Sequence, residues 1–528
     1  MNKNIFRIVF NRARGLLMVV GELAKGAVKS ASQLLRGTKA VGLRPRTVTI
    51  KPLVFALWLI AGLVQAPQTL AQIIPDNSVN PSLNVINAAD GRPQVNIQAP
   101  NQQGLSHNVY SQFNVNTQGA ILNNSANDVL TPGTWVMGNP NLVNGTATVI
   151  LNEVNSFNPS VLNGFIEVAG DRADVIVANP AGITCSGCGF INAQQSTLTT
   201  GRPQISNGNL MGYRVTQGQV TIGEGGFNAG GSDYTQIIAR SIQVNGDVVA
   251  NNLRVTAGAN EVARDGQVLQ TLAGEGEVPE FAIDVASLGG MYAGHIHLIG
   301  TEAGVGVRNA GEIGASVGEF RLNAEGQLVN TGRIVAEGNV EISSNDQVDN
   351  LGSGRIYGED VIIQAETLNN RSEGDRAPVI AARNDMRLGV NHLTNEGVDT
   401  LIASVRNMTI GGAIDDQGEV SGRAEYVDNA FGNIEAGLNL SIDATTITNR
   451  AEGYEMVDGE QVTRPVEYTV NTDNGYDRYE GTETVIEREV QIINPGTLIA
   501  GGDITLNADL IDNENSRIVA GGELLTLG

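Results

Sequence analysis

Two short motifs contain the side chains with the clearest potential for chemistry. Cys185-Ser186-Gly187-Cys188 holds both cysteines of the 528-residue chain, and His295 and His297 are two of its four histidines. Two cysteines at this spacing form either a redox pair or a disulfide. Histidines at i and i+2 on a strand share one face and could bind a metal. Because no Cys or acidic residue lies at ligand spacing from them, we expect no metal site and no cofactor.

Charged side chains do not gather into a catalytic set. Carboxylates such as Glu341 and Asp360 stand at outward positions of alternating segments, which is typical of a solvated acidic face. Some β-rich enzymes cleave polysaccharides, but they need a local cluster of Asp, Arg or Lys, and the sequence contains none. We therefore predict no enzymatic activity in this segment. A net charge of −23 also argues against nucleic-acid binding, which needs a basic surface.

The first 71 residues differ sharply in charge from the rest. They contain eleven Lys and Arg and a single acidic residue, Glu22, whereas the other 457 residues hold 22 bases and 55 acids. The basic stretch ends in the apolar run 53–64, and Thr69-Leu70-Ala71 follows. This order predicts a secretory signal peptide at 1–71, cleaved between Ala71 and Gln72. A buried core helix is the alternative; twelve apolar residues are too few to span a membrane.

The body of the chain repeats about every twenty residues. Asn309, Asn330, Asn350 and Asn370 follow one another at spacings of 21, 20 and 20. Between them, apolar and polar residues alternate in stretches of three to five, which predicts short strands separated by turns. Such a unit buries its apolar side only by stacking on its neighbours. The expected rows of stacked core residues are Leu328, Val348 and Leu368, and Phe320, Val340 and Val361.

This pattern predicts an all-β chain that forms a right-handed parallel β-helix. A leucine-rich repeat would need helical stretches, and calcium-binding nonapeptides would need a G-G-x-G-x-D series; the sequence contains neither. Before about residue 240 the period is blurred, so we expect an N-terminal cap there. The signal peptide places the chain in an oxidising compartment, which favours a structural disulfide between Cys185 and Cys188 over a redox pair.

The segment 451–491 interrupts the repeat. It contains Tyr454, Tyr468, Tyr476 and Tyr479, and its alternating halves flank the turn Asp473-Asn474-Gly475. We predict an antiparallel β excursion. Two roles remain open for it: packing against the side wall of the coils, or a platform that binds a sugar or a protein.

Several motifs resemble those of two-partner secretion exoproteins of the filamentous haemagglutinin type. Asn139-Pro140-Asn141-Leu142 matches the N-P-N-L of that family, and Asn179-Pro180-Ala181-Gly182-Ile183 matches its N-P-N-G-I except at Ala181. The basic start of the chain resembles the extended signal peptide of large Gram-negative exoproteins. Asn, Pro and Gly favour turns, so these motifs are either structural turns or direct contacts to a transporter. Together with the Cys pair, these features make the chain similar to that family over the signal peptide and nearly half of the chain.

The resemblance implies a function in export. Residues 72–315 would be the secretion domain, recognised by the periplasmic docking domains of a cognate outer-membrane β-barrel transporter, and residues 316–528 would be filament repeats. The protein would reach the surface of a Gram-negative bacterium or the medium. The whole protein would be a contact-dependent growth inhibition toxin carrier; the alternatives are an adhesin of the filamentous haemagglutinin type, or a haemolysin. Each implies a receptor on a host cell or a neighbouring bacterium, and we expect further effector sequence beyond residue 528.

Overall fold

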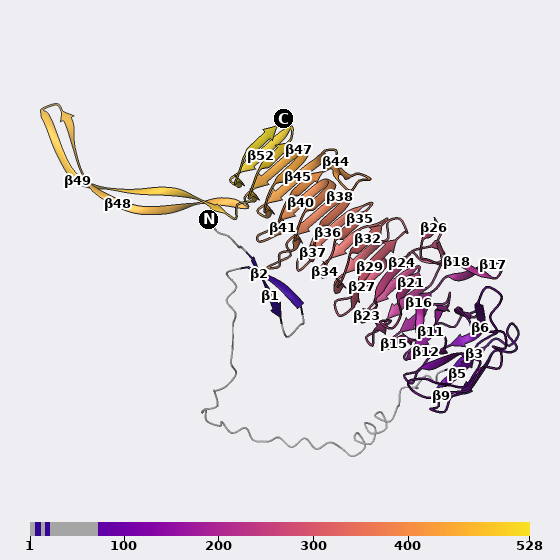
Figure 1. Ribbon diagram of the computed structural model, residues 1–528. Helices are drawn as coiled ribbons and strands as arrows, with labels where there is room; N and C mark the ends of the chain where they lie inside the picture. The colour runs from indigo at the N-terminus through magenta and orange to yellow at the C-terminus, as the bar shows by residue number, and fades with distance from the viewer. Residues whose placement is uncertain (1–5, 12–15, 22–71) are drawn as a thin grey trace, which may run out of the picture. The chain divides into compact units, whose positions relative to one another are not determined.

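The computed structural model describes residues 6–11, 16–21 and 72–528 (Figure 1). Near the start of the chain, β1 (Phe6–Asn11) pairs antiparallel with β2 (Leu16–Gly21). The apolar run of the signal peptide and Ala71 of the expected cleavage site lie outside the described residues. Every regular element in the described part is a strand, and no helix there has the length and apolar character needed to span a membrane.

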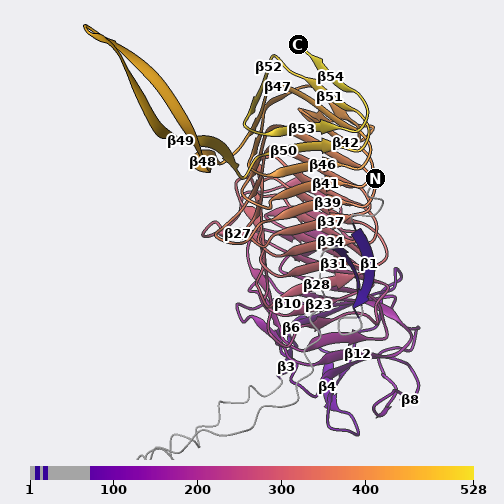
Figure 2. The same ribbon diagram turned by 90° about the vertical axis from the view of Figure 1, so that its left-hand side faces the viewer.

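Residues 72–528 wind into stacked coils of three strands, which confirms the predicted parallel β-helix (Figure 2). One coil consists of β32 (Phe320–Ala324), β33 (Leu328–Asn330) and β34 (Arg333–Ala336), and the next of β35 (Val340–Ser344), β36 (Gln347–Leu351) and β37 (Arg355–Gly358). Each strand pairs in parallel with the corresponding strand of the next coil. One side of the stack is a sheet of 16 strands, from β4 (Asn84–Asn87) to β53 (Arg517–Ala520).

The other two sides merge at a corner that some strands cross without a break. The strands β38 (Val361–Arg371), β40 (Met386–Glu396) and β47 (Leu440–Arg450) have 11 residues each. The first half of β38 pairs with β35, and its second half pairs with β36. In the coils that these strands form, two sides of the β-helix are therefore one bent sheet.

The interior consists of the rows predicted from the repeat. Phe320, Val340 and Val361 pair in register along one side, and all three side chains are fully buried. Leu328, Val348 and Leu368 form a second row and are equally buried. Successive residues of a strand point to opposite sides of the sheet. The residues that alternate with these core residues along each strand therefore face solvent. Each coil thus covers the apolar surface of its neighbours.

The repeated asparagines form a buried ladder along the β-helix. From Asn309 to Asn449, the side-chain nitrogen (Nδ2) of each donates a hydrogen bond to the side-chain oxygen (Oδ1) of the asparagine in the following coil, at 2.7–2.8 Å. The last member, Asn513, is exposed and donates to the Ser516 carbonyl at 3.0 Å. The members are Asn309, Asn330, Asn350, Asn370, Asn395, Asn429, Asn449 and Asn513. The same nitrogens also reach backbone carbonyls; that of Asn350 is 3.3 Å from the carbonyl oxygen of Val379. The ladder satisfies polar groups that the coils would otherwise bury without partners.

The N-terminal cap is smaller than the blurred repeat suggests. Apart from short insertions, the antiparallel pairs among the described strands of this region are β3 (Ile73–Pro75) with β6 (Leu105–Phe113), and β4 (Asn84–Asn87) with β5 (Pro93–Asn96). Parallel stacking already begins where β6 pairs with β10 (Val149–Val154). The expectation of a cap reaching to about residue 240 is therefore wrong.

Insertions, rather than missing coils, hide the repeat in this region. They supply β17 (Arg202–Ser206), β18 (Asn209–Val215), β25 (Asn260–Ala263) and β26 (Val268–Thr271). The four strands form an antiparallel sheet whose Tyr213 and Val262 bury the outward-facing Leu151. The coils beneath are consequently apolar on both faces, and this masks the alternation in the sequence.

A long hairpin leaves the stack between two coils, as predicted for an antiparallel excursion. It is formed by β48 (Gly453–Thr472) and β49 (Gly475–Ile493), which pair only with each other among the described strands. Its four tyrosine side chains are 48–72% exposed. The alternative in which this segment packs against the side wall is therefore wrong.

Candidate functional site

The first family motif forms a turn at the N-terminal end of the β-helix. The side-chain oxygen of Asn139 accepts a hydrogen bond from the backbone N–H of Asn141 (3.0 Å), and the backbone N–H of Leu142 donates to the carbonyl of Asn139 (3.2 Å). The Asn139 amide donates to the carbonyls of Ile97 and Asn123, at 3.0 and 2.9 Å. Asn139 thereby ties the turn to two strands of the cap.

The rest of this motif is also turned inward. Asn141 donates to the carbonyls of Ser82 and Ile97, at 3.1 and 3.0 Å. Leu142 is buried in the main core, and only the ring of Pro140 is exposed. The cap is therefore stabilised from inside by the side chains of Asn139, Asn141 and Leu142.

The second motif forms the same kind of turn, at the corner between β13 (Ala173–Ala178) and β14 (Ile183–Cys185). The side-chain oxygen of Asn179 accepts from the backbone N–H of Ala181 (2.9 Å), and the Gly182 N–H donates to the Asn179 carbonyl (3.0 Å). Gly182 has φ +117°, a conformation that glycine adopts without strain. The turn uses the backbone of Ala181, so the departure from the family motif at this position leaves it intact.

Asn179 also connects this corner to the preceding coil. Its amide donates to the carbonyl of Asn158 and to the hydroxyl of Ser160, both at 2.9 Å. Asn179, Pro180 and Ile183 are buried, and Ile183 pairs in register with Ser160. No hydrogen bond in the described residues joins the two motifs, so each stabilises its own part of the fold.

The two cysteines lie at the next corner. Cys185 ends β14, Cys188 begins β15 (Cys188–Ile191), and a disulfide joins their buried sulfur atoms. Ser186 and Gly187 make the turn; Gly187 has φ +79° and donates its N–H to the Gly226 carbonyl (2.8 Å). Neighbouring coils therefore hold this corner even without the covalent bond.

Removing the disulfide should cost little. We expect Cys185→Ser/Cys188→Ser to lower the free energy of unfolding by about 2 kcal/mol, because closing a loop of four residues removes little entropy from the unfolded chain. Chemical denaturation of both forms measures this difference. Alkylation of the non-reduced secreted protein is the companion experiment, and labelling of both cysteines would contradict the disulfide.

The two histidines lie on the outer surface. They belong to β29 (His295–Gly300) and point to the same side. His297 lies 2.9 Å from the side-chain oxygen of Asn323, and burial lowers its pKa below the ordinary value. Within the described residues, no group of three or more His, Cys, Asp or Glu is arranged to hold a metal.

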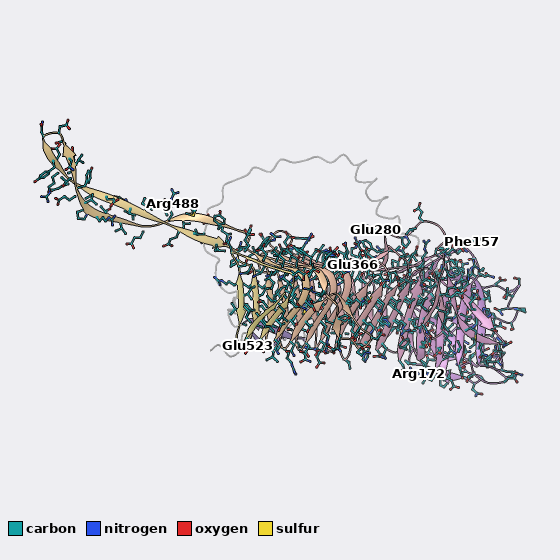
Figure 3. The ribbon with its side chains drawn as sticks, turned by 90° about the horizontal axis from the view of Figure 1, so that it is seen from above. Phe157, Arg172, Glu280, Glu366, Arg488 and Glu523 are labelled. Carbon is teal, nitrogen blue, oxygen red and sulfur yellow. A yellow bond between two sulfur atoms is a disulfide. The ribbon has the colours of Figure 1, made fainter. Side chains whose placement is uncertain are left out.

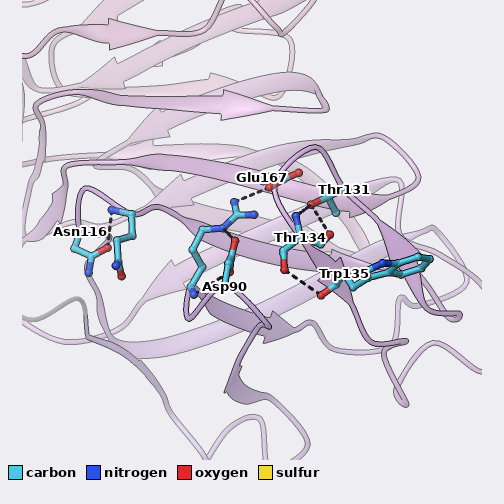
Figure 4. Close-up of polar contacts among 8 residues, drawn as sticks. Asp90, Asn116, Thr131, Thr134, Trp135 and Glu167 are labelled. Carbon is cyan, nitrogen blue, oxygen red and sulfur yellow. Dashed lines mark hydrogen bonds and ion pairs between the residues drawn. The ribbon is translucent and has the colours of Figure 1, made fainter.

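A half-enclosed ion cluster lies in the cap, where the sequence alone indicated nothing (Figure 4). The guanidinium of Arg92 contacts Asp90 and Glu167, each at 2.6 Å, and the Glu167 side chain is only 3% exposed. Burial would raise the pKa of Asp90, but the Arg92 backbone N–H and guanidinium outweigh it and keep that pKa low. These residues line a hollow of about 480 Å³ together with Gln118 and Gly133.

A short hairpin beside this cluster exposes large apolar side chains. It consists of β8 (Val129–Leu130) and β9 (Trp135–Val136), joined by a turn in which Thr134 donates its N–H to the Thr131 hydroxyl. Leu130, Trp135 and the following Met137 are 59–62% exposed. The only signal in the sequence was the concentration of large apolar residues around Thr131-Pro132-Gly133.

Comparison with known families and proteins agrees with these features. The family described as the TPS secretion domain matches residues 71–330, and the family described as the Extended Signal Peptide of Type V secretion system matches residues 1–51. Toxin CdiA of Yersinia pestis is 48% identical over 365 residues, which cover 68% of this chain and 11% of the relative. The 16S rRNA endonuclease CdiA of Enterobacter cloacae is 36% identical over 480 residues, covering 83% of this chain and 14% of the relative.

One further relative and one solved structure are also similar to this chain. The tRNA nuclease CdiA of Escherichia coli O6:K15:H31 is 39% identical over 404 residues, covering 67% of this chain and 12% of that protein. The crystal structure of the filamentous haemagglutinin secretion domain is 32% identical, with a TM-score of 0.44, and covers 56% of this chain and 96% of that one. The chain thus spans little more than a tenth of the length of the curated relatives it matches. With an extended signal peptide and a TPS secretion domain, the chain belongs to the two-partner secretion exoproteins, which are exported across the Gram-negative envelope.

Proposed function

We propose that the secretion domain is recognised by a cognate outer-membrane β-barrel transporter, and that the coils beyond it begin the filament of the exported protein. The TPS secretion domain match over residues 71–330 carries this proposal. We place the boundary between secretion domain and filament near residue 315, because the regular series of coils of about 20 residues starts there. Transporter recognition is a binding activity, and we assign no catalytic step to this segment.

The burial of the two motifs bears on how they would be recognised. In the folded domain, Asn139, Leu142, Asn179 and Ile183 are buried. A transporter that threads an unfolded chain meets them before they fold, when all four side chains are accessible. We therefore propose that the motifs have two successive roles, first as recognition signals in the unfolded segment and then as contacts that stabilise the folded domain.

A pair of substitutions separates these two roles. Asn179→Ala removes the motif residue, whereas Ser160→Ala removes only its hydrogen-bond partner and leaves the motif intact. If the transporter recognises the unfolded motif, Asn179→Ala will reduce the amount of secreted protein at least tenfold. Ser160→Ala will leave that amount within about twofold of the wild-type level. The amount of protein in the medium and the amount retained in the periplasm measure this. Equal secretion of both variants at wild-type level would remove the recognition role.

For the whole protein, we propose a toxin carrier in contact-dependent growth inhibition. Support comes from the three relatives at 36–48% identity, whose names are those of a toxin and two RNA nucleases. In that case the toxin activity of the whole protein would lie outside residues 1–528, because these residues match only about a tenth of each relative. An adhesin of the filamentous haemagglutinin type is the second candidate, and a haemolysin the third.

Co-culture distinguishes these candidates. A strain that expresses the whole gene should reduce the number of viable target cells only when the two strains touch. If a small gene lies immediately downstream, a target that carries it should survive. Growth inhibition through a filter, or survival of unprotected targets alongside binding to host cells, would support the haemolysin or the adhesin instead.

A further inference from the structure

The β48–β49 hairpin has two unlike faces. Cross-strand partners point to the same side, so the register assigns every side chain to a face. One face carries the apolar row, which we define as Val462, Val466, Tyr468, Val470, Tyr479 and Val485. The opposite face around the same positions carries Thr463 opposite Thr484, Glu467 opposite Glu480, and Thr469 opposite Arg478.

The apolar row is uncovered, and one ion pair on the same face, Arg464 with Glu483, interrupts it between Val462 and Val466. Val462 pairs with Val485, and Tyr468 pairs with Tyr479, whose ring lies stacked on it at a centroid distance of 5.5 Å. The side chains of Val462, Tyr468 and Tyr479 are 48–58% exposed. Figure 3 shows the side chains of both strands, with Arg488 labelled, projecting from a ribbon that no other described strand flanks.

Both long edges of the ribbon are also open. A two-stranded hairpin is marginally stable by itself, and a third strand or a packing partner supplies the missing burial. Each unpaired edge presents a row of backbone N–H and C=O groups to which an extended segment can add. An added strand would place alternate side chains beside the apolar row and would cover part of Tyr468 and Tyr479.

Charge indicates which kind of segment fits. Between residues 453 and 493 the chain has ten acidic and three basic residues, a balance of −7. The three arginines are already engaged within the hairpin: Arg464 with Glu483, Arg478 with Glu467, and Arg488 with Asp458. The remaining acidic excess repels a second copy of the same hairpin and attracts a basic strand.

From these observations we propose that the β48–β49 hairpin is a docking arm, to which an extended, lysine- or arginine-rich segment of a partner protein adds as a third strand. The backbone edge provides the hydrogen bonds, the apolar row provides the burial, and the carboxylates select for positive charge. This role is independent of transporter recognition, because the hairpin lies outside the family match to the secretion domain.

A designed peptide tests the arm on the secreted chain. The probe is a labelled twelve-residue peptide in which Lys alternates with Val, and its counterpart carries Glu in place of Lys. We expect the Lys peptide to bind with an affinity that falls at least tenfold between 50 and 300 mM salt, and the Glu peptide not to bind. Fluorescence anisotropy measures both. Absence of Lys-peptide binding, or equal binding of both peptides, would overturn the proposal.

Two variants assign the binding to one face. Tyr468→Ser/Tyr479→Ser should weaken binding of the Lys peptide at least tenfold, whereas Tyr476→Ser, which changes an exposed tyrosine on the opposite face, should leave it within twofold. The circular dichroism spectra of both variants should show the same β-strand content. Equal weakening by both variants would show that the apolar row is not the contact. If sedimentation reveals a dimer that Tyr468→Ser/Tyr479→Ser abolishes, the face belongs to a second copy and the proposal is wrong.

Discussion

Replacing Asn350 with Ala should open the coils on either side of it. The Asn350 side chain is fully buried, accepts a hydrogen bond from the amide of Asn330 and donates to Asn370 and to the carbonyl of Val379. Alanine removes one hydrogen-bond partner from each of these three buried groups, although the Asn330 amide keeps a contact to the Arg355 carbonyl at 3.4 Å. A buried polar group left unsatisfied costs about 1–3 kcal/mol. We expect the local free energy of unfolding to fall by about 3–5 kcal/mol, as an estimate for several lost hydrogen bonds.

Hydrogen exchange measures this effect best, because stacked coils unfold locally rather than all at once. Amides of β36 and β38 should exchange far faster in Asn350→Ala, while those of the secretion domain should change little. Asn369→Ala is the matched control: this neighbour of the ladder is partly exposed and donates to Asp349 on the outer surface. Its cost should stay below about 1 kcal/mol. Similar exchange in the two variants would contradict a stabilising ladder.

Replacing Arg92 with Met should destabilise the cap by about 3–5 kcal/mol at pH 7, because it leaves the buried Glu167 carboxylate without its partner. An unpaired, buried carboxylate has a raised pKa in the folded state. Between the pKa of this carboxyl in the unfolded chain and its higher pKa in the folded variant, the folded variant binds a proton that the unfolded chain has released. The free energy of unfolding therefore falls as the pH rises between these two pKa values. Lowering the pH from 7 to 5 should recover part of the lost stability.

The double variant Arg92→Met/Glu167→Met controls for packing. It removes both charges and should recover most of the stability, because replacing a buried ion pair with apolar residues is often neutral. Its stability should also lose the added pH dependence of Arg92→Met. Thermal unfolding of the three proteins at pH 5 and pH 7 measures both effects. A double variant as unstable as Arg92→Met would show that the cost is one of shape rather than of charge.

The repeat explains why part of this structure could be predicted. A spacing of 20 or 21 residues places Asn309 beside Asn330 and Leu328 beside Val348, so the coils and their core rows follow from the sequence. The excursion at Tyr468 and Tyr479 was predictable because it interrupts that period. Its freedom from the side wall was not, because the same alternation of residues suits a strand that packs and a strand that does not.

The cap has no such period, and its contacts could not be predicted. Arg92 and Glu167 are 75 residues apart, and nothing in the local sequence of either identifies the other. The antiparallel sheet of β17, β18, β25 and β26 likewise joins two insertions about 45 residues apart, where strands far apart in the chain meet through tertiary packing alone. The motifs at Asn139 and Asn179 were recognisable as turns, but only their contacts reveal that the side chains point inward.

The asparagine ladder also gives the filament a direction. From Asn309 to Asn449, each amide nitrogen points toward the coil that follows in the chain, while the side-chain oxygen of Asn309, at the beginning of the row, has no hydrogen-bond partner in the described structure. In a chain whose coils fold in sequence order, each folded coil would therefore offer a donor to the coil that forms next. The incoming coil can accept it only when its own asparagine arrives at the right place, so a slip of one residue leaves the donor unmatched. The ladder would thus favour the correct register of each new coil on the preceding one as the filament lengthens.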